Sequence, residues 1–135
     1  MLKTFHGSCH CGSVRFEADI DLSQGTGKCN CSICTKMRNW SAQVKPDAFR
    51  LLEGEDALSD YQWGAKNGHF PFCRTCGMRT FSRGYVEEIG GAYVTVMLSA
   101  LDDVDPAELA EAPRRYYDGR NNNNWWNAPA EVRHL

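Results

Sequence analysis

The chain carries three cysteines within six residues, in the stretch Cys29-Asn30-Cys31-Ser32-Ile33-Cys34. In a strand, residues i and i+2 point to the same face, so the side chains of Cys29 and Cys31 can converge on one point. A turn through Ser32 and Ile33 would bring Cys34 round to the same point. Thiolates are soft ligands that favour zinc over a hard cation, and a zinc ion held by three protein ligands keeps one position open for water or substrate.

The remaining four of the seven cysteines form a second set. They occur in two short motifs, residues 9–12 (CHCG) and residues 73–77 (CRTCG). Each motif ends in glycine, which allows the backbone to turn tightly beneath a metal ion. Two ligands from each motif make a closed tetrahedral site, so the cysteines divide into a set of four and a set of three.

Three other interpretations of the cysteines stay open. Disulfide bonds are disfavoured because seven is an odd number and the first residues are too short and too polar for a secretory signal. Buried, unreactive thiols are disfavoured by the clustering at ligand spacing. The third interpretation is that both zinc ions are structural, with a fourth ligand for the second ion among His6, His10, His69 and His134.

Three motifs follow one another along the chain, at residues 7–17 (GSCHCGSVRFE), 29–36 (CNCSICTK) and 72–77 (FCRTCG). In this order they resemble the glutathione-dependent formaldehyde-activating enzyme family, which also includes centromere protein V. The resemblance covers roughly residues 5–80 and implies a β-tent fold with two zinc ions. It also implies that Cys9, Cys11, Cys73 and Cys76 hold a structural zinc ion, and that Cys29, Cys31 and Cys34 hold a catalytic one where a glutathione-linked substrate binds.

The chemistry of an open three-cysteine site agrees with this resemblance. Three thiolates leave a zinc ion with a formal charge of about −1, which weakens its power to acidify water and favours one more thiolate as the fourth ligand. Because a thiol and an aldehyde combine to a hemithioacetal, we expect a zinc-dependent carbon–sulfur lyase that acts on a thiol adduct of a small aldehyde, with glutathione or a similar thiol as co-substrate. The alternative is a non-catalytic two-zinc β-tent protein that serves as an interaction or carrier module.

Length and composition limit the remaining possibilities. The 135 residues predict a single domain, with the motif core at about 5–80 and a strand, a short helix and a tail in residues 84–135. A formal net charge of −2 disfavours nucleic-acid binding. No apolar run approaches the roughly 20 residues that span a bilayer. Seven reduced cysteines fit the cytoplasm.

Several basic and aromatic residues have more than one interpretation. Lys28, Lys36 and Arg38 form either a solvated basic edge or an attraction for an anionic ligand, such as the carboxylates of glutathione. Trp40 either walls the site or simply packs, and packing is expected. The pair Trp125 and Trp126 either caps hydrophobic surface, covers the open zinc ion or contacts another protein, so a homodimer is possible.

The hydrophobic pattern predicts a mainly β protein of several antiparallel strands with one short helix near the C-terminus. The helix is expected at 105–112, with Asp105 as its N-cap and Pro106 in its first turn. Tyr93 and Met97 are expected in the core. The predicted strands are 1–8, 14–18, 41–45, a hairpin formed by 49–53 and 58–63, an edge segment at 69–72, a return strand at 78–82, and 92–98, with a loop at 19–28.

Overall fold

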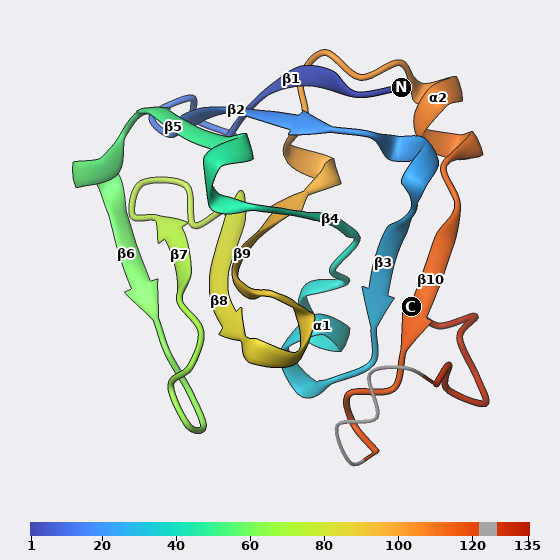
Figure 1. The fold of residues 1–135 in the computed structure, drawn as a ribbon. Coiled ribbons are helices and arrows are strands. Elements are labelled where there is room, and N and C mark those ends of the chain that lie inside the picture. The colour runs from blue at the N-terminus through green and yellow to red at the C-terminus, as the bar shows by residue number, and fades with distance from the viewer. Residues whose placement is uncertain (122–126) are drawn as a thin grey trace.

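The strands of the protein form three sheets, which together make a mainly β fold (Figure 1). The computed structural model describes residues 1–121 and 127–135. Within this part, the sheets have the strand orders β1-β2-β5, β10-β3-β4-β9-β8 and β6-β7. The strands are β1 (Lys3–Ser8), β2 (Arg15–Ile20), β3 (Thr26–Cys29), β4 (Ser41–Val44), β5 (Phe49–Glu53), β6 (Leu58–Tyr61), β7 (Phe70–Cys73), β8 (Phe81–Val86), β9 (Gly91–Met97) and β10 (Arg114–Tyr117).

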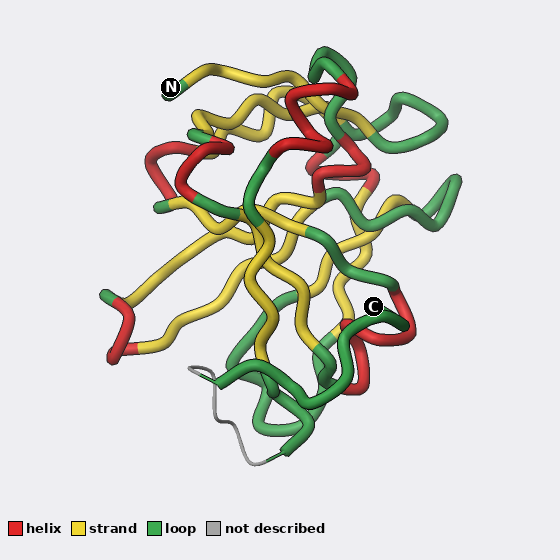
Figure 2. The backbone as a smooth tube through the Cα atoms, turned by 90° about the vertical axis from the view of Figure 1, so that its right-hand side faces the viewer, coloured by secondary structure: helices red, strands yellow, loops and turns green. Residues whose placement is uncertain are grey.

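Two short α-helices accompany the sheets in the described residues, where the sequence predicted one. The predicted helix is present as α2 (Pro106–Glu111), and Asp105 caps it by accepting a hydrogen bond of 2.8 Å from the backbone N–H of Ala107. The additional helix is α1 (Ser32–Met37), which replaces the expected turn in the triple-cysteine stretch. Figure 2 shows that helical segments are short and lie between strands; five of them are 3-10 turns, at Leu22–Gln24, Pro46–Ala48, Glu55–Ala57, Glu87–Ile89 and Leu98–Ala100.

A stack of phenylalanine rings joins two of the sheets. The ring of Phe49 on β5 lies 5.3 Å from that of Phe16 on β2 and 4.6 Å from that of Phe81 on β8, measured between centroids. All three rings are buried in the main core, together with Met97, whose core position was predicted. Buried and half-exposed residues alternate along β2, as in an amphipathic strand. The buried residues Phe16, Ala18 and Ile20 lie on the side of β2 that faces the main core.

The hairpin predicted from residues 49–53 and 58–63 is wrong. Both segments are strands, but β5 pairs antiparallel with β2, whereas β6 pairs antiparallel with β7. Between them, Gly54 has a φ of +92°, and a Cβ atom there would overlap the backbone of Ser13. The turn at Gly54 therefore moves the chain from one sheet into another, and β5 contributes the buried Phe49 to the core.

Three other strand predictions differ from the structure. The expected loop at 19–28 contains β3, and the return strand expected at 78–82 begins later, as β8. The tail contributes β10, which runs parallel to β3 although no strand was predicted there. Glycine and lysine make β3 a weak local strand former, and its hydrogen-bond partners are distant in the sequence, so local pattern does not reveal it.

Candidate metal centres

Four cysteines from two distant motifs meet at one point. The Sγ atoms of Cys9, Cys11, Cys73 and Cys76 all lie within 4.8 Å of one another. The Sγ atoms of Cys9 and Cys11 are 3.7 Å apart, and those of Cys11 and Cys73 are 3.6 Å apart. A tetrahedral zinc ion with Zn–S bonds of about 2.3 Å requires sulfur separations of about 3.8 Å. This cluster, called the four-cysteine cluster below, therefore fits a tetrahedral metal ion.

Tight turns in both motifs build the four-cysteine cluster. Gly12 and Gly77 have positive φ angles of 83° and 78°, a conformation that glycine adopts without strain. Gly77 donates a backbone hydrogen bond of 2.7 Å to the carbonyl of Cys73. Val14 donates its N–H to the Cys9 sulfur over 3.3 Å and is buried beside Cys9 and Cys73 in a small core of its own. Cys9, Val14 and Cys73 thus form a small buried core between the end of β7 and the loop before β2.

The other three cysteines also converge. Cys29 ends β3, Cys31 is the N-cap of α1, and Cys34 lies in α1. Their Sγ atoms lie within 4.8 Å of one another, and we call this group the three-cysteine cluster. Residues three apart in a helix share a face, so α1 brings Cys34 back toward Cys31. The side chain of Asn39 donates a 3.5 Å hydrogen bond to the Cys34 sulfur.

The three-cysteine cluster favours one thiolate and opposes three. Hydrogen bonds from Cys29 and Cys34 lower the pKa of Cys31. The pKa of Cys34 is raised, because its thiol bonds to Cys29 and Cys31 and because it is buried. The same crowding raises the pKa of Cys29, with the contact to Cys31 as the largest cause. Only a bound cation would hold all three sulfurs ionised together, so this donor set fits a metal ion whose binding releases protons.

No fourth protein ligand completes the three-cysteine cluster. Residues 1–121 and 127–135 contain every histidine, aspartate and glutamate of the chain, and none of these side chains joins the three thiols. His6 pairs with Asp103, His69 pairs with Asp60, and His10 and His134 are exposed. All seven cysteines are free, so no disulfide forms. The cluster therefore differs from the four-cysteine cluster in having one ligand fewer.

His6 on β1 pairs with Asp103 in the segment after β9, and this contact predicts that thermal stability depends on pH. Its Nδ1 lies 3.0 Å from Asp103 and its Nε2 lies 3.3 Å from Glu17, and these contacts, that to Asp103 first, raise the pKa of His6 above 6.5. A raised pKa contributes stability at low pH that is lost as the pH rises through it. We expect the melting temperature of the wild type to fall relative to His6→Gln between pH 6 and 8.5, with His134→Gln as control; parallel curves would contradict this.

Asn30 is a site residue that sequence reasoning missed. It lies between Cys29 and Cys31 and is only 6% exposed. Its Nδ2 donates to Asp118 over 2.8 Å, its Oδ1 accepts from the backbone N–H of Arg120 over 2.9 Å, and Arg120 Nε donates to its carbonyl over 3.0 Å. The segment after β10 therefore holds the triple-cysteine stretch in place. The signal was an uncharged polar residue between two ligands, whose side chain must point away from the metal.

No site role was predicted for two half-buried residues, Tyr93 and Arg79. Tyr93 was expected in the core but is half-buried, with burial as the main cause of its raised pKa and the Cys34 thiolate as the second. Its hydroxyl lies against Gly84 of β8, where an added Cβ would overlap it. Arg79 is also half-buried, and its guanidinium carbon lies 4.8 Å from the ring centroid of Phe70.

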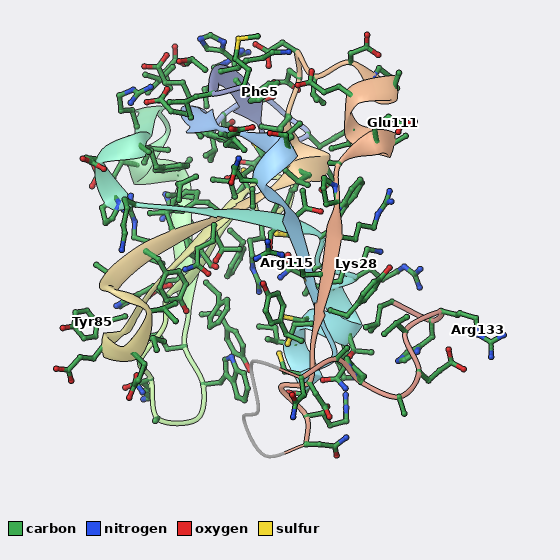
Figure 3. All side chains as sticks on the ribbon, turned by 45° about the vertical axis from the view of Figure 1, so that its right-hand side comes forward. Phe5, Lys28, Tyr85, Glu111, Arg115 and Arg133 are labelled. Atoms are coloured by element: carbon green, nitrogen blue, oxygen red, sulfur yellow. The ribbon has the colours of Figure 1, made fainter. Side chains whose placement is uncertain are left out.

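Within residues 1–121 and 127–135, the basic residues that flank the triple-cysteine stretch donate no hydrogen bond to its sulfurs. Lys36 and Arg38 are exposed. Lys28 lies on the opposite face of β3 from Cys29, because neighbouring strand residues alternate, and its Nζ lies 5.8 Å from the ring centroid of Trp40. Figure 3 shows Lys28 and Arg115 on the neighbouring strands β3 and β10. Trp40 packs as predicted, whereas Trp125 and Trp126 lie outside the described residues.

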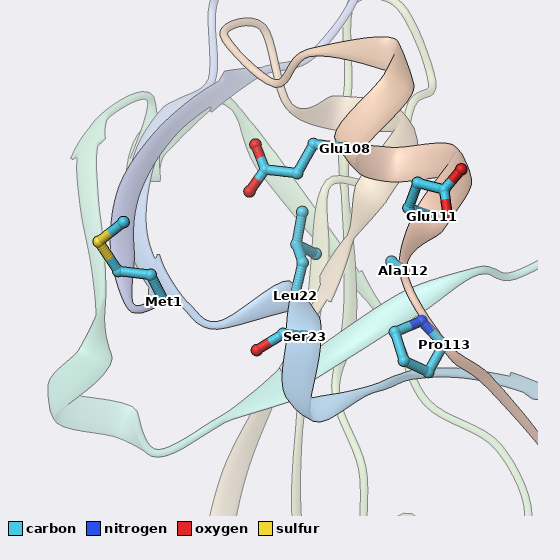
Figure 4. Close-up of a pocket in the computed structure, with 7 residues that line it drawn as sticks. All are labelled: Met1, Leu22, Ser23, Glu108, Glu111, Ala112 and Pro113. Atoms are coloured by element: carbon cyan, nitrogen blue, oxygen red, sulfur yellow. The ribbon is translucent and has the colours of Figure 1, made fainter.

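The surface hollow drawn in Figure 4 is separate from both clusters. It lies between the start of the chain and α2 and contains no cysteine. Glu108, one of its two carboxylates, already pairs with Lys3 at 3.0 Å. Its lining residues are Met1, Leu22, Ser23, Glu108, Glu111, Ala112 and Pro113.

Two thiol clusters on a mainly β framework define a class of protein that could bind two metal ions through cysteine. The chain belongs to the glutathione-dependent formaldehyde-activating enzyme family, whose profile matches residues 4–118. The crystal structure of a Rhodobacter sphaeroides protein is similar, with 29% sequence identity and a TM-score of 0.68 over 82% of this chain and 99% of that chain. In the described residues, no helix has the length and apolar character needed to cross a membrane.

Proposed function

We propose that the chain binds two zinc ions and is a carbon–sulfur lyase that acts on a thiol adduct of a small aldehyde. The three-cysteine cluster is the catalytic site, and the four-cysteine cluster is structural. The observation that carries this proposal is the convergence of three thiols without a fourth histidine, cysteine or carboxylate ligand in the described residues. Family membership supports glutathione as the thiol and formaldehyde as the model for the aldehyde.

When bound at Cys29, Cys31 and Cys34, zinc would supply a Lewis acid with room for one more thiolate. The chain's own residues prepare this position. Asn39 donates to the Cys34 sulfur, and the backbone N–H of Cys31 donates to the Cys29 sulfur over 3.3 Å. These bonds disperse the negative charge of the sulfurs and orient them.

The reaction itself needs no redox step. In the adduct-forming direction, a bond forms between the thiol sulfur and the carbonyl carbon of the aldehyde, and the thiol proton ends on the carbonyl oxygen. In the lyase direction, the same bond breaks and the proton returns to sulfur. Burial raises the pKa of Tyr93, so its hydroxyl stays protonated at neutral pH and can donate a hydrogen bond.

A thiol titration tests the proposal directly. In protein reconstituted with cobalt(II), we expect glutathione to change the visible absorption bands in a saturable way, because a further thiolate would enter the open coordination position. S-methylglutathione, which lacks the thiol, should leave the bands unchanged. If no low-molecular-weight thiol perturbs the cobalt bands, the lyase proposal fails, and the two clusters belong to a non-catalytic interaction or carrier module.

Two parts of the proposal concern the protein's surroundings. Seven free thiols fit a reducing compartment such as the cytoplasm. A homodimer remains a prediction, and size-exclusion chromatography with light scattering would measure the mass of the particle.

A further inference from the structure

Asn30, between two of the three clustered cysteines, is bonded mainly to a segment that lies far along the chain. Its backbone N–H donates to the carbonyl of Tyr117 over 3.2 Å, and its side chain bonds to Asp118 at 2.8 Å and to the backbone N–H of Arg120 at 2.9 Å. Its carbonyl accepts from Arg120 Nε over 3.0 Å and from the Thr35 hydroxyl over 2.9 Å. All but the last of these hydrogen bonds involve residues 117–120. Because Asn30 is buried, breaking them would leave its polar groups unpaired.

Asn30 also connects the two elements that carry the cysteines of this cluster. Cys29 is the last residue of β3 and Cys31 is the N-cap of α1, so the backbone at Asn30 sets how far apart their sulfurs lie. Among the described residues, β3 pairs with β4 at a single position but with β10 along its whole length. The helix α1 has six residues and no side-chain cap bond, and such a short helix is marginal without tertiary support. The support for both elements therefore comes largely from β10 and the segment after it.

The four-cysteine cluster is built without this segment. Within residues 1–121 and 127–135, no hydrogen bond joins residues 117–120 to either motif of that cluster. Its cysteines are held by the turns at Gly12 and Gly77 and by the small core around Val14. A change in residues 117–120 should therefore affect one cluster and spare the other, which provides an internal control in the same molecule.

We propose that Asp118 and Arg120 are positioning residues, which act through Asn30 to hold the sulfurs of Cys29 and Cys31 at metal-binding separation. The affinity of the three-cysteine cluster for its metal ion then depends on a segment that is 90 residues away at Arg120. This inference rests on the zinc site of the proposed function, but it requires neither a thiol nor a reaction. Because linked binding equilibria are reciprocal, the metal ion must in turn stabilise the bound conformation of the segment.

Removal of zinc by a chromogenic chelator measures the affinity of each cluster. The two steps are assigned with Cys31→Ser, which lacks the step of the three-cysteine cluster. We expect Asp118→Ala and Arg120→Met each to weaken zinc binding at the three-cysteine cluster by about 10-fold, the effect of one hydrogen bond to a charged group. The step of the four-cysteine cluster should stay unchanged. The exposed Arg115→Met on β10 is the matched control and should change neither step.

A double-substitution cycle shows whether the effect passes through Asn30. In Asn30→Ala the side-chain bonds are already lost, so adding Asp118→Ala should weaken zinc binding no further. Adding Arg120→Met should still weaken it, because the guanidinium group bonds to the backbone carbonyl of residue 30. A general weakening of the fold would instead make both effects additive. Arg120 is exposed, so Arg120→Met decides the matter if Asp118→Ala does not fold.

Hydrogen exchange tests the reciprocal effect. The N–H of Arg120, which bonds to Asn30, should exchange more slowly in the zinc-loaded wild type than in Cys31→Ser. Equal exchange in these two proteins, equal weakening of both clusters, additive effects of Asp118→Ala in Asn30→Ala, or no change in either single variant would overturn the inference alone, since the wild type would still hold two zinc ions. A wild type that binds zinc only at the four-cysteine cluster would overturn both the inference and the proposed function.

Discussion

Cys76→Ser is expected to abolish cooperative folding. The second, smaller core of the protein contains only three buried residues in the described part of the chain, Cys9, Val14 and Cys73. Two of the three are cysteines of the four-cysteine cluster, so this region depends on metal binding more than on apolar packing. A structural zinc ion contributes on the order of 10 kcal/mol to the folding of small zinc peptides. Because whole domains are stable by only about 5–15 kcal/mol, losing most of that contribution leaves the native state close to or below the unfolded state.

The choice of Cys76 separates metal binding from packing. Its side chain is half-buried, so a serine of similar size leaves no large cavity, whereas Cys73 is fully buried. Thermal unfolding followed by circular dichroism, together with zinc per chain, measures the effect. Thr75→Ser is the matched control, since Thr75 is exposed in the same turn and should behave as wild type. A Cys76→Ser protein that melts cooperatively near the wild-type temperature would show that this cluster is dispensable for the fold.

Cys31→Ser is expected to give the opposite combination: loss of one zinc ion and of all thiol binding, with a cooperative thermal transition. Cys31 and Cys34 are half-buried, and neither these two residues nor the buried Cys29 packs in one of the two hydrophobic clusters. Serine is a preferred N-cap residue, and Cys31 makes no side-chain cap bond to α1, so the substitution should not weaken the helix.

Zinc content, the melting transition and the thiol titration of the cobalt protein are measured on the same preparation. Ser32→Ala, at an exposed neighbouring position, is the control and should keep two zinc ions and the thiol response. If Cys31→Ser unfolds as completely as Cys76→Ser, both clusters are structural and the division of roles proposed above is wrong. If Cys31→Ser keeps the thiol response, the ligand binds elsewhere.

Local sequence rules predicted the elements whose causes are local. Asp105 and Pro106 identified α2 because an N-cap and a first-turn proline act within one turn of the chain. The β-branched run in β9 identified that strand. α1 was missed because it has six residues, a cysteine N-cap without a cap bond, and two β-branched residues, Ile33 and Thr35, so its helix propensity is low.

Strand pairing could not be predicted in the same way. The segment around Gly54 has the pattern of a hairpin, but β5 pairs with β2 and β6 pairs with β7, so the two strands enter different sheets. Likewise β10 pairs with β3, and its following segment bonds to Asn30, over a separation of 90 residues at Arg120. Such contacts depend on the whole core, which no window of sequence contains.

The sequence by itself determined the mainly β class, the family and the division of the cysteines into four and three, because ligand spacing is a short-range property of the chain. Only the tertiary structure decided that no histidine completes the three-cysteine cluster. It also decided that Asn39 donates a hydrogen bond to the Cys34 sulfur, that Asn30 ties the triple-cysteine stretch to the segment after β10, and that Lys28 lies beside Trp40. The physical reason is one of range along the chain. Cysteines that bind one metal ion lie a few residues apart in the sequence, whereas the residues around the metal come from strands that meet only after the core has formed.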